Sequence, residues 1–363
     1  MRRLLAPIAA LAALLLVAGP AAAVAPGWTH PLQVFAERFG PAHSMVLDAA
    51  GKVHIAVEGP LTGGIWYITN ATGSWTTTQV TTQVDVEPSI SLAGGFVYIA
   101  FVRQDPGTFQ PKSLWTVTNA TGPWVATKRH TGKDHNPSLV VSGGTYSLAF
   151  WTKGAGGGLK YLTNAGGPWS LSTIDVTCCA VGGPSLRLTA GGLARVAYPD
   201  GSTSSGTGLN LAKRSAGGVW SVDTVDFHSS QWPRLVINGD AKLVVVYLRK
   251  GVGTYVAAQS AGTWGQSLVG TGYLYPPDIA VWGSGVTAST AIIVGKLGIL
   301  TIYTSGDIAT HYDLVHTGMD SNGEIEQHGG KLRVIFNRSS GGTGDGIYYT
   351  KENLAAFRGA QGQ

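Results

Sequence analysis

The sequence predicts an all-β protein, a seven-bladed β-propeller of four-stranded antiparallel blades. A turn ending in Gly-x-Trp recurs, most clearly in Asn70–Trp75, Asn119–Trp124 and Asn164–Trp169. A short strand opening, often Pro-Ser, recurs with the same period. Repeats of roughly 40–50 residues built from short strands are typical of propellers. The 52 glycines and the 12% of charged residues suit many turns between short strands.

The tryptophans of this turn are spaced regularly along the chain. Weaker copies of the turn are Ser215–Trp220 and Ser260–Trp264, and the five tryptophans lie 49, 45, 51 and 44 residues apart. Regular recurrence indicates a structural role. We therefore expect these side chains to pack between blades rather than to serve as platforms for a ligand.

The strand openings give the number of blades. Each opening is a triplet whose second residue follows the previous one by 45, 49, 47, 49, 44 and 46 residues. Seven openings predict seven blades. These second residues are Ser44, Ser89, Ser138, Ser185, Arg234, Asp278 and Glu324.

Each unit has four strands in the same order. In the second unit we expect them at Ser89–Leu92, Phe96–Phe101, Ser113–Thr118 and Trp124–Lys128. Alternating apolar residues separated by Gly-rich turns support this assignment.

The two ends of the chain complete one blade together. The last unit has strands at Leu332–Phe336 and Gly346–Thr350, but no Gly-x-Trp strand follows. The segment Trp28–Val34 resembles the missing strand. We expect it to close the ring as the outermost strand of the seventh blade, which removes an exposed edge. The propeller is then predicted over 24–357, with a tail over 358–363.

The N-terminus, residues 1–23, reads as a secretory signal peptide. Arg2 and Arg3 precede an apolar run, Leu4–Val17, and small residues follow. Secretion or another extracytoplasmic location is therefore expected. An uncleaved membrane anchor is the alternative, but the run is short for a membrane span. No later segment is expected to cross a membrane.

The charge pattern argues against a nucleic-acid partner. Removing Arg2 and Arg3 lowers the formal net charge from +5 to about +3, and no basic run remains. The sequence contains no convincing metal motif, and no cofactor is expected. We expect a monomer whose partner is a glycan or another small polar ligand.

The Asn-x-x-Gly-x-Trp turn resembles the Asp-box, or BNR, repeat of sialidase-like propellers. Asn or Ser stands where that repeat carries Asp, so the boxes are degenerate. The resemblance implies a secreted protein that recognises or processes carbohydrate. The family includes sialidases, other glycoside hydrolases, polysaccharide lyases and lectins, and the fold does not choose among them. The box itself is structural there, so it implies no catalytic role for Asn70, Asn119 or Asn164.

The candidate site is the channel mouth, where loops leading into the innermost strands meet. Histidine and neighbouring carboxylates could act there as general acid and base. The alternative is that polar residues simply occupy surface loops. The catalytic candidates are His135, His228 and Tyr275. The ligand-binding candidates are Asp85, Glu87, Asp134, Trp232, Asp278, Asp320 and Glu324.

Three arginines fall at one equivalent position, the end of the second strand. They are Arg103, Arg249 and Arg338, in blades two, five and seven. Arginine binds carboxylates through two hydrogen bonds, and sialidases hold their acidic sugar with three arginines. The hypothesis is that these three bind an acidic ligand. The alternative is three solvated loop residues, because the blades are spread around the ring.

Cys178 and Cys179 are the only cysteines, and they are adjacent. Free thiols seldom persist in an oxidising compartment. A vicinal disulfide is therefore the leading interpretation, although it strains the intervening peptide. A reduced pair, a metal site and an intermolecular bridge are the alternatives.

These observations predict carbohydrate recognition or processing at the channel mouth. A non-catalytic lectin or a protein-interaction scaffold is the alternative. The arrangement of side chains distinguishes an enzyme from a lectin or scaffold, since an enzyme needs His, Tyr and a carboxylate to meet in one pocket.

Overall fold

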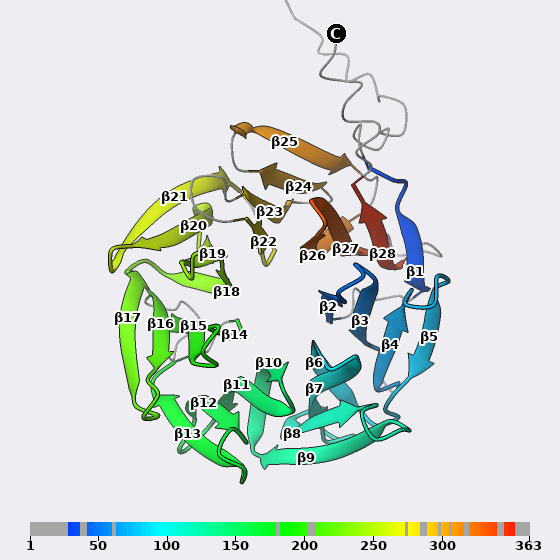
Figure 1. Cartoon of the computed structure of the whole chain (residues 1–363), viewed down its shortest axis with the longest axis vertical. Helices are drawn as coiled ribbons and strands as arrows, with labels where there is room; N and C mark the ends of the chain where they lie inside the picture. The colour runs from blue at the N-terminus through cyan, green and yellow to red at the C-terminus, as the bar shows by residue number, and fades with distance from the viewer. Residues whose placement is uncertain are drawn as a thin grey trace, which may run out of the picture.

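The fold is a ring of seven four-stranded antiparallel blades, which confirms the predicted propeller (Figure 1). The computed structural model describes residues 28–36, 42–59, 63–178, 182–201, 208–272, 275–283, 289–296, 299–304, 307–315, 319–339 and 345–352. Within these ranges every regular element is a strand. They contain no helix of the length and apolarity that a membrane span requires. The predicted signal peptide, 1–23, and the tail, 358–363, lie outside the described residues.

The strands of each blade follow one another outward from the axis of the ring (Figure 1). Blades one to three comprise β2 (His43–Leu47), β3 (Val53–Glu58), β4 (Ile65–Thr69), β5 (Thr76–Gln79); β6 (Asp85–Ala93), β7 (Phe96–Gln104), β8 (Pro111–Thr118), β9 (Val125–Thr131); and β10 (Lys133–Ser142), β11 (Thr145–Lys153), β12 (Gly158–Thr163), β13 (Ser170–Asp175). Blades four and five comprise β14 (Ser185–Leu188), β15 (Ala194–Asp200), β16 (Gly208–Arg214), β17 (Trp220–Asp226); and β18 (Ser230–Ile237), β19 (Leu243–Arg249), β20 (Gly253–Ser260), β21 (Thr263–Thr271). Blades six and seven comprise β22 (Asp278–Trp282), β23 (Ser289–Lys296), β24 (Ile299–Thr304), β25 (Asp307–Val315); and β26 (Met319–His328), β27 (Lys331–Ser339), β28 (Gly346–Lys351) with β1 (Leu32–Ala36).

The N-terminal strand closes the ring, as predicted. β1 pairs antiparallel with β28 and forms the outer edge of blade seven (Figure 1). The strand begins at Leu32 instead of Trp28, because Pro31 has no N–H to continue the ladder. Trp28 forms only an isolated bridge with Glu352, and its ring packs on the core between blades six and seven.

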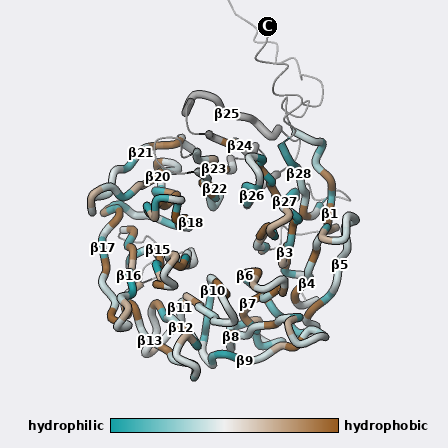
Figure 2. Tube along the Cα trace, viewed as in Figure 1, coloured by the Kyte–Doolittle hydropathy of each residue, from teal (hydrophilic) through white to brown (hydrophobic). Residues whose placement is uncertain are grey.

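Apolar side chains fill the interfaces between blades. The described residues form seven clusters, and each joins two neighbouring blades. Figure 2 shows apolar segments along middle strands such as β3 and β7, whereas the outer strands β5 and β9 are mostly polar. Burial between blades therefore holds the ring together, since it removes apolar surface from water.

The recurrent turn is structural. The side-chain oxygens of Asn70, Asn119 and Asn164 accept hydrogen bonds of 2.7–2.9 Å from a peptide N–H at the start of the second strand, on its first or second residue, in their own blades. The predicted packing of its tryptophans is confirmed. Trp75 contacts Tyr349 of blade seven edge-on, with ring centres 5.1 Å apart, and Trp220 contacts Tyr161 of blade three at 5.2 Å.

The second residue of six of the seven predicted openings forms a hydrogen bond to the next blade. A side-chain oxygen at this position accepts a backbone N–H from the neighbouring inner strand, for example Ser138 from Leu186 at 3.0 Å. The same bond forms at six positions, which are Ser44, Ser89, Ser138, Ser185, Asp278 and Glu324. Arg234 occupies the seventh position and has no acceptor to offer. Apart from Arg234, the residues that we used to count the blades are thus the ones whose side chains form hydrogen bonds between neighbouring blades.

Candidate functional site

Four inner strands carry a bulge at the mouth of the channel. In β6, β10, β18 and β26 the register shifts just before the opening residue. The bulged residues Glu87, Asn136, Trp232 and Asn322 have left-handed backbones with φ between 47° and 55°. They therefore belong to the inner strands, whereas the sequence placed them in loops leading into those strands. Left-handed non-glycine residues are strained, and such strain gathers at functional sites.

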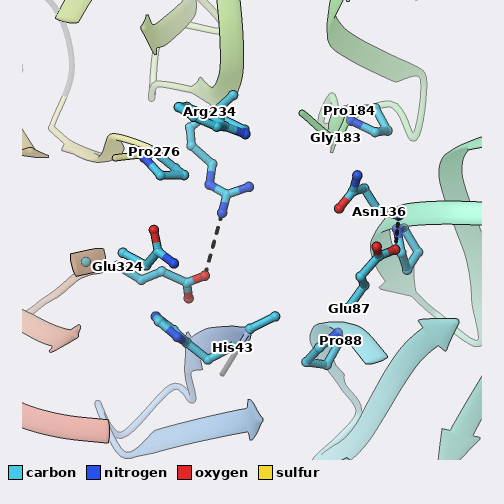
Figure 3. A pocket seen from close by; sticks show the side chains of 14 residues that line it. His43, Glu87, Pro88, Asn136, Gly183, Pro184, Arg234, Pro276 and Glu324 are labelled. Atoms are coloured by element: carbon cyan, nitrogen blue, oxygen red, sulfur yellow. Dashed lines mark hydrogen bonds and ion pairs between the residues drawn. The ribbon is translucent and has the colours of Figure 1, made fainter. Parts of the chain in front are cut away.

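All four bulged residues line one cavity of about 270 Å³, which we call the mouth cavity. Every blade contributes to its wall, including His43 from blade one. Figure 3 shows the side chains of Glu87 and Asn136 on one side and those of Arg234 and Glu324 on the other. Three predicted ligand-binding residues, Glu87, Trp232 and Glu324, are brought together here.

Glu87 organises the side of the mouth cavity between blades two and three. Its carboxylate accepts the peptide N–H of Asn136 at 2.6 Å and lies 3.5 Å from Nδ1 of His135. The ring of His135 stacks on Trp151, with centres 4.4 Å apart and an interplanar angle of 17°. His135 thus adjoins the mouth cavity through Glu87 and is not part of its lining.

A second cavity of about 360 Å³ continues along the inner strands, and we call it the channel cavity. Charged side chains of blades four to seven gather here. Arg234 lies 3.6 Å from Asp278 and 3.7 Å from Glu324, and its side chain is 39% exposed. Arg187 and Glu326 line the same cavity. Arg234 lines both cavities, so it joins the mouth to the channel.

Burial raises the pKa of the carboxyl groups that line the channel cavity. Burial raises the pKa of Glu324 to about 8, against the lowering effect of Arg234 and with a further increase from Asp278. Burial also raises the pKa of Glu326 to about 7 and that of Asp278 above its usual value. The raised pKa shifts Glu324 toward its protonated form.

These shifts predict that stability falls as the pH rises from about 4.5 to about 8. Across that window the folded chain holds protons on Glu324 and Glu326 that the unfolded chain releases, so the free energy of unfolding decreases. Melting temperatures at pH 5, 7 and 9 and constant ionic strength measure the effect. Glu324→Gln should flatten the decline, and a melting temperature that rises across the window would contradict the assignment.

The three predicted arginines do not converge. Arg103 forms two hydrogen bonds, of 2.7 and 2.9 Å, with the buried Asp85 and covers Trp115. Arg249 pairs with Asp226 at 2.7 Å and covers Tyr255. Arg338 covers Tyr348. Each guanidinium packs against an aromatic ring of its own blade, and none lines the mouth cavity.

The remaining candidates lie outside the mouth cavity. Asp134 is fully buried and accepts hydrogen bonds from His130 and Thr152. His228 is 64% exposed at its side chain and pairs with Asp226. Tyr275 is not among the residues that line the cavity. The predicted catalytic residues His135, His228 and Tyr275 are thus not brought together.

Asp278, Asp320 and the cysteine pair remain to be placed. Asp278 lines the channel cavity and accepts a hydrogen bond from the peptide N–H of Ile325 in blade seven. The side chain of Asp320 falls outside the described residues. Cys178 is buried in the core between blades three and four, but Cys179 lies outside the described residues, so the vicinal disulfide stays a prediction. Among the described residues no three His, Cys, Asp or Glu side chains form a group that could hold a metal ion.

Sequence reasoning missed the role of Arg234. The signal was present, because this residue interrupts a series of serines at the second position of the openings. Asn136 and Asn322 were not among the candidates. Their left-handed backbones have no local signature that the repeat alone reveals.

Solved structures of low sequence identity share this fold. Virginiamycin B lyase from Staphylococcus aureus has a TM-score of 0.59 and 14% identity, with 90% of this chain and 99% of that chain covered. The leech intramolecular trans-sialidase, solved with 2,7-anhydro-Neu5Ac, has a TM-score of 0.50 and 11% identity, with 92% and 71% covered. The six-bladed fucose-binding lectin of Aleuria aurantia has a TM-score of 0.51 and 14% identity, with 79% and 98% covered.

No family model and no curated protein sequence matches the chain. The comparisons therefore support the likeness to sialidase-type propellers at the level of the fold, and they give no sequence support for Asp-box repeats. The similar structures include a sialidase, a lyase and a lectin, so the fold alone leaves the reaction open.

Proposed function

We propose that the protein binds a carbohydrate in the mouth cavity. The observation that carries the proposal is the convergence of four strained residues from four blades on one cavity. A left-handed conformation costs about 1–3 kcal/mol for Glu87 and for Trp232, and less for the two asparagines, whose side chains tolerate it. This repeated conformation is explained if the side chains must be presented in a fixed arrangement to a ligand.

The chemistry of the cavity suits a sugar. Glu87, Asn136 and Asn322 supply acceptors and donors for hydroxyl groups, and Trp232 supplies an apolar surface for a ring. Small-ligand sites combine apolar or aromatic surface with a few placed polar groups in the same way. A concave mouth favours a small ligand over the flat surface expected of a protein scaffold.

A glycan array with the purified protein, followed by titration calorimetry on the best ligand, tests this proposal. Trp232→Gly should weaken that ligand at least about tenfold, because an aromatic contact is lost while glycine tolerates the same backbone. Phe227→Ala is the matched control, since Phe227 is 83% exposed and lies outside the cavity. The proposal fails if no glycan binds or if Trp232→Gly binds as tightly as the original protein.

One observation favours an enzyme as the second candidate. Glu324 lines the mouth cavity and its raised pKa favours the protonated form, so it could donate a proton to a leaving group as a general acid. Product analysis on any bound glycan tests this function. Glu324→Gln should then retain binding and lose turnover. Release of products by Glu324→Gln at the original rate would exclude Glu324 as the general acid. If the original protein forms no product from any bound glycan, the protein is a lectin.

A further inference from the structure

A third cavity lies between blades one and two and shares no lining residue with the mouth cavity. Its volume is about 240 Å³. That is slightly below the roughly 300–1,000 Å³ of pockets for drug-sized ligands, so it suits a ligand with a single ring. Its polar and aromatic lining comes from Glu58, Asp85, Gln104 and Phe109. Val84 and Val86 supply apolar surface.

Phe109 is presented to this cavity by a rigid loop. Its backbone is left-handed, with φ of 53°, and the residue is 49% exposed. Asp105 holds the loop, because one carboxylate oxygen accepts the N–H groups of Gly107 and Thr108 and its carbonyl accepts that of Phe109 at 2.8 Å. The aromatic ring is thus fixed at the rim at a cost in backbone strain.

Glu58 has no cationic partner among the described residues, where no Lys, Arg or His forms an ion pair with it. Arg103, the nearest arginine in sequence on the neighbouring blade, is committed to both oxygens of Asp85. Glu58 accepts a backbone hydrogen bond from Glu87, while burial raises its pKa to about 7. A cation beside Glu58 would favour its ionised form.

We infer that this cavity binds the ammonium group of a small amine-bearing ligand, of which an amino sugar is the simplest. Glu58 would pair with the ammonium group, the Gln104 carbonyl would accept a second hydrogen bond, and the face of Phe109 would attract the cation. The inference goes beyond the proposed function and does not depend on it, because the two cavities have separate linings.

Calorimetric titration of the full chain with D-glucosamine at pH 7 tests the inference, with D-glucose and N-acetyl-D-glucosamine as neutral counterparts. Glucosamine should bind about tenfold more tightly than either, since a charge-assisted hydrogen bond is lost without the ammonium group. Glu58→Gln should remove this preference, and Phe109→Ala should weaken glucosamine severalfold. Phe96→Ala is the matched control, because Phe96 is an equally exposed phenylalanine, at 42%, outside this cavity.

Equal binding of the three sugars, no detectable binding of glucosamine, or a preference that survives Glu58→Gln would each overturn the inference. Melting temperatures verify that each variant is folded. Trp232→Gly should leave the glucosamine preference unchanged. A failure of the mouth cavity to bind carbohydrate is therefore distinguishable from a failure of this site.

Discussion

Replacing Gly346 with valine is expected to destabilise the closed ring by about 3 kcal/mol or more. Gly346 begins β28, and a Cβ built there would lie 2.1 Å from the carbonyl oxygen of Phe35 in β1. Gly158 begins the third strand of blade three and meets the carbonyl of Asp175 at the same distance. The N-terminal strand thus makes the same close approach as an ordinary fourth strand. Valine at Gly346 would push it away.

Urea denaturation of the variant measures this loss. Gly166→Ala is the control, because nothing lies within 4 Å of a Cβ at Gly166 and its backbone is not left-handed. Gly158→Val should cost about as much as Gly346→Val. If Gly346→Val unfolds at the urea concentration of the original protein, then β1 does not close the ring as described.

Arg103→Met is expected to cost about 3–5 kcal/mol of stability, because it leaves a buried carboxylate without its partner. The side chain of Asp85 is fully buried, and Arg103 supplies both of its charged hydrogen bonds. Methionine retains part of the packing on Trp115, so the loss reports mainly the unpaired charge. Denaturant unfolding at pH 7 measures it.

Two further variants sharpen this experiment. Lys112→Met removes an exposed ion pair with Asp105 and should change stability by less than about 1 kcal/mol. Adding Asp85→Asn to Arg103→Met should recover part of the loss, because the buried charge is gone. The hypothesis that Arg103 binds an acidic ligand predicts the opposite pattern, with lost binding and unchanged stability.

The fold was predictable because its signals are local. The seven openings and the Asn-x-x-Gly-x-Trp turns repeat within short stretches, and strand patterns depend on neighbouring residues. The role of the N-terminal strand followed from counting, since one unit lacked its outer strand. Its start was misplaced by four residues because Trp28 looks like the repeat's tryptophan, whereas Pro31 interrupts the ladder.

The candidate site was predictable only in part. Glu87, Trp232 and Glu324 were expected at the mouth and line its cavity. Arg103 and Arg249 were expected to face a ligand, but each is paired with a carboxylate. Asp85 comes from the adjacent strand of the same blade, and Asp226 comes from the outer strand of the preceding blade. Aligning the seven repeats indicates where along its strand a residue lies. It does not indicate which side chains form pairs.

The sequence by itself determined the number of blades, the order of strands and the closure of the ring, because each depends on periodic patterns within about 50 residues. Only the tertiary structure decided which polar groups face the mouth. Glu87, Asn136, Trp232 and Asn322 meet there although they are up to 235 positions apart, from 87 to 322. Their meeting depends on the bulges in β6, β10, β18 and β26 and on the ring arrangement of the blades, which packing between blades maintains.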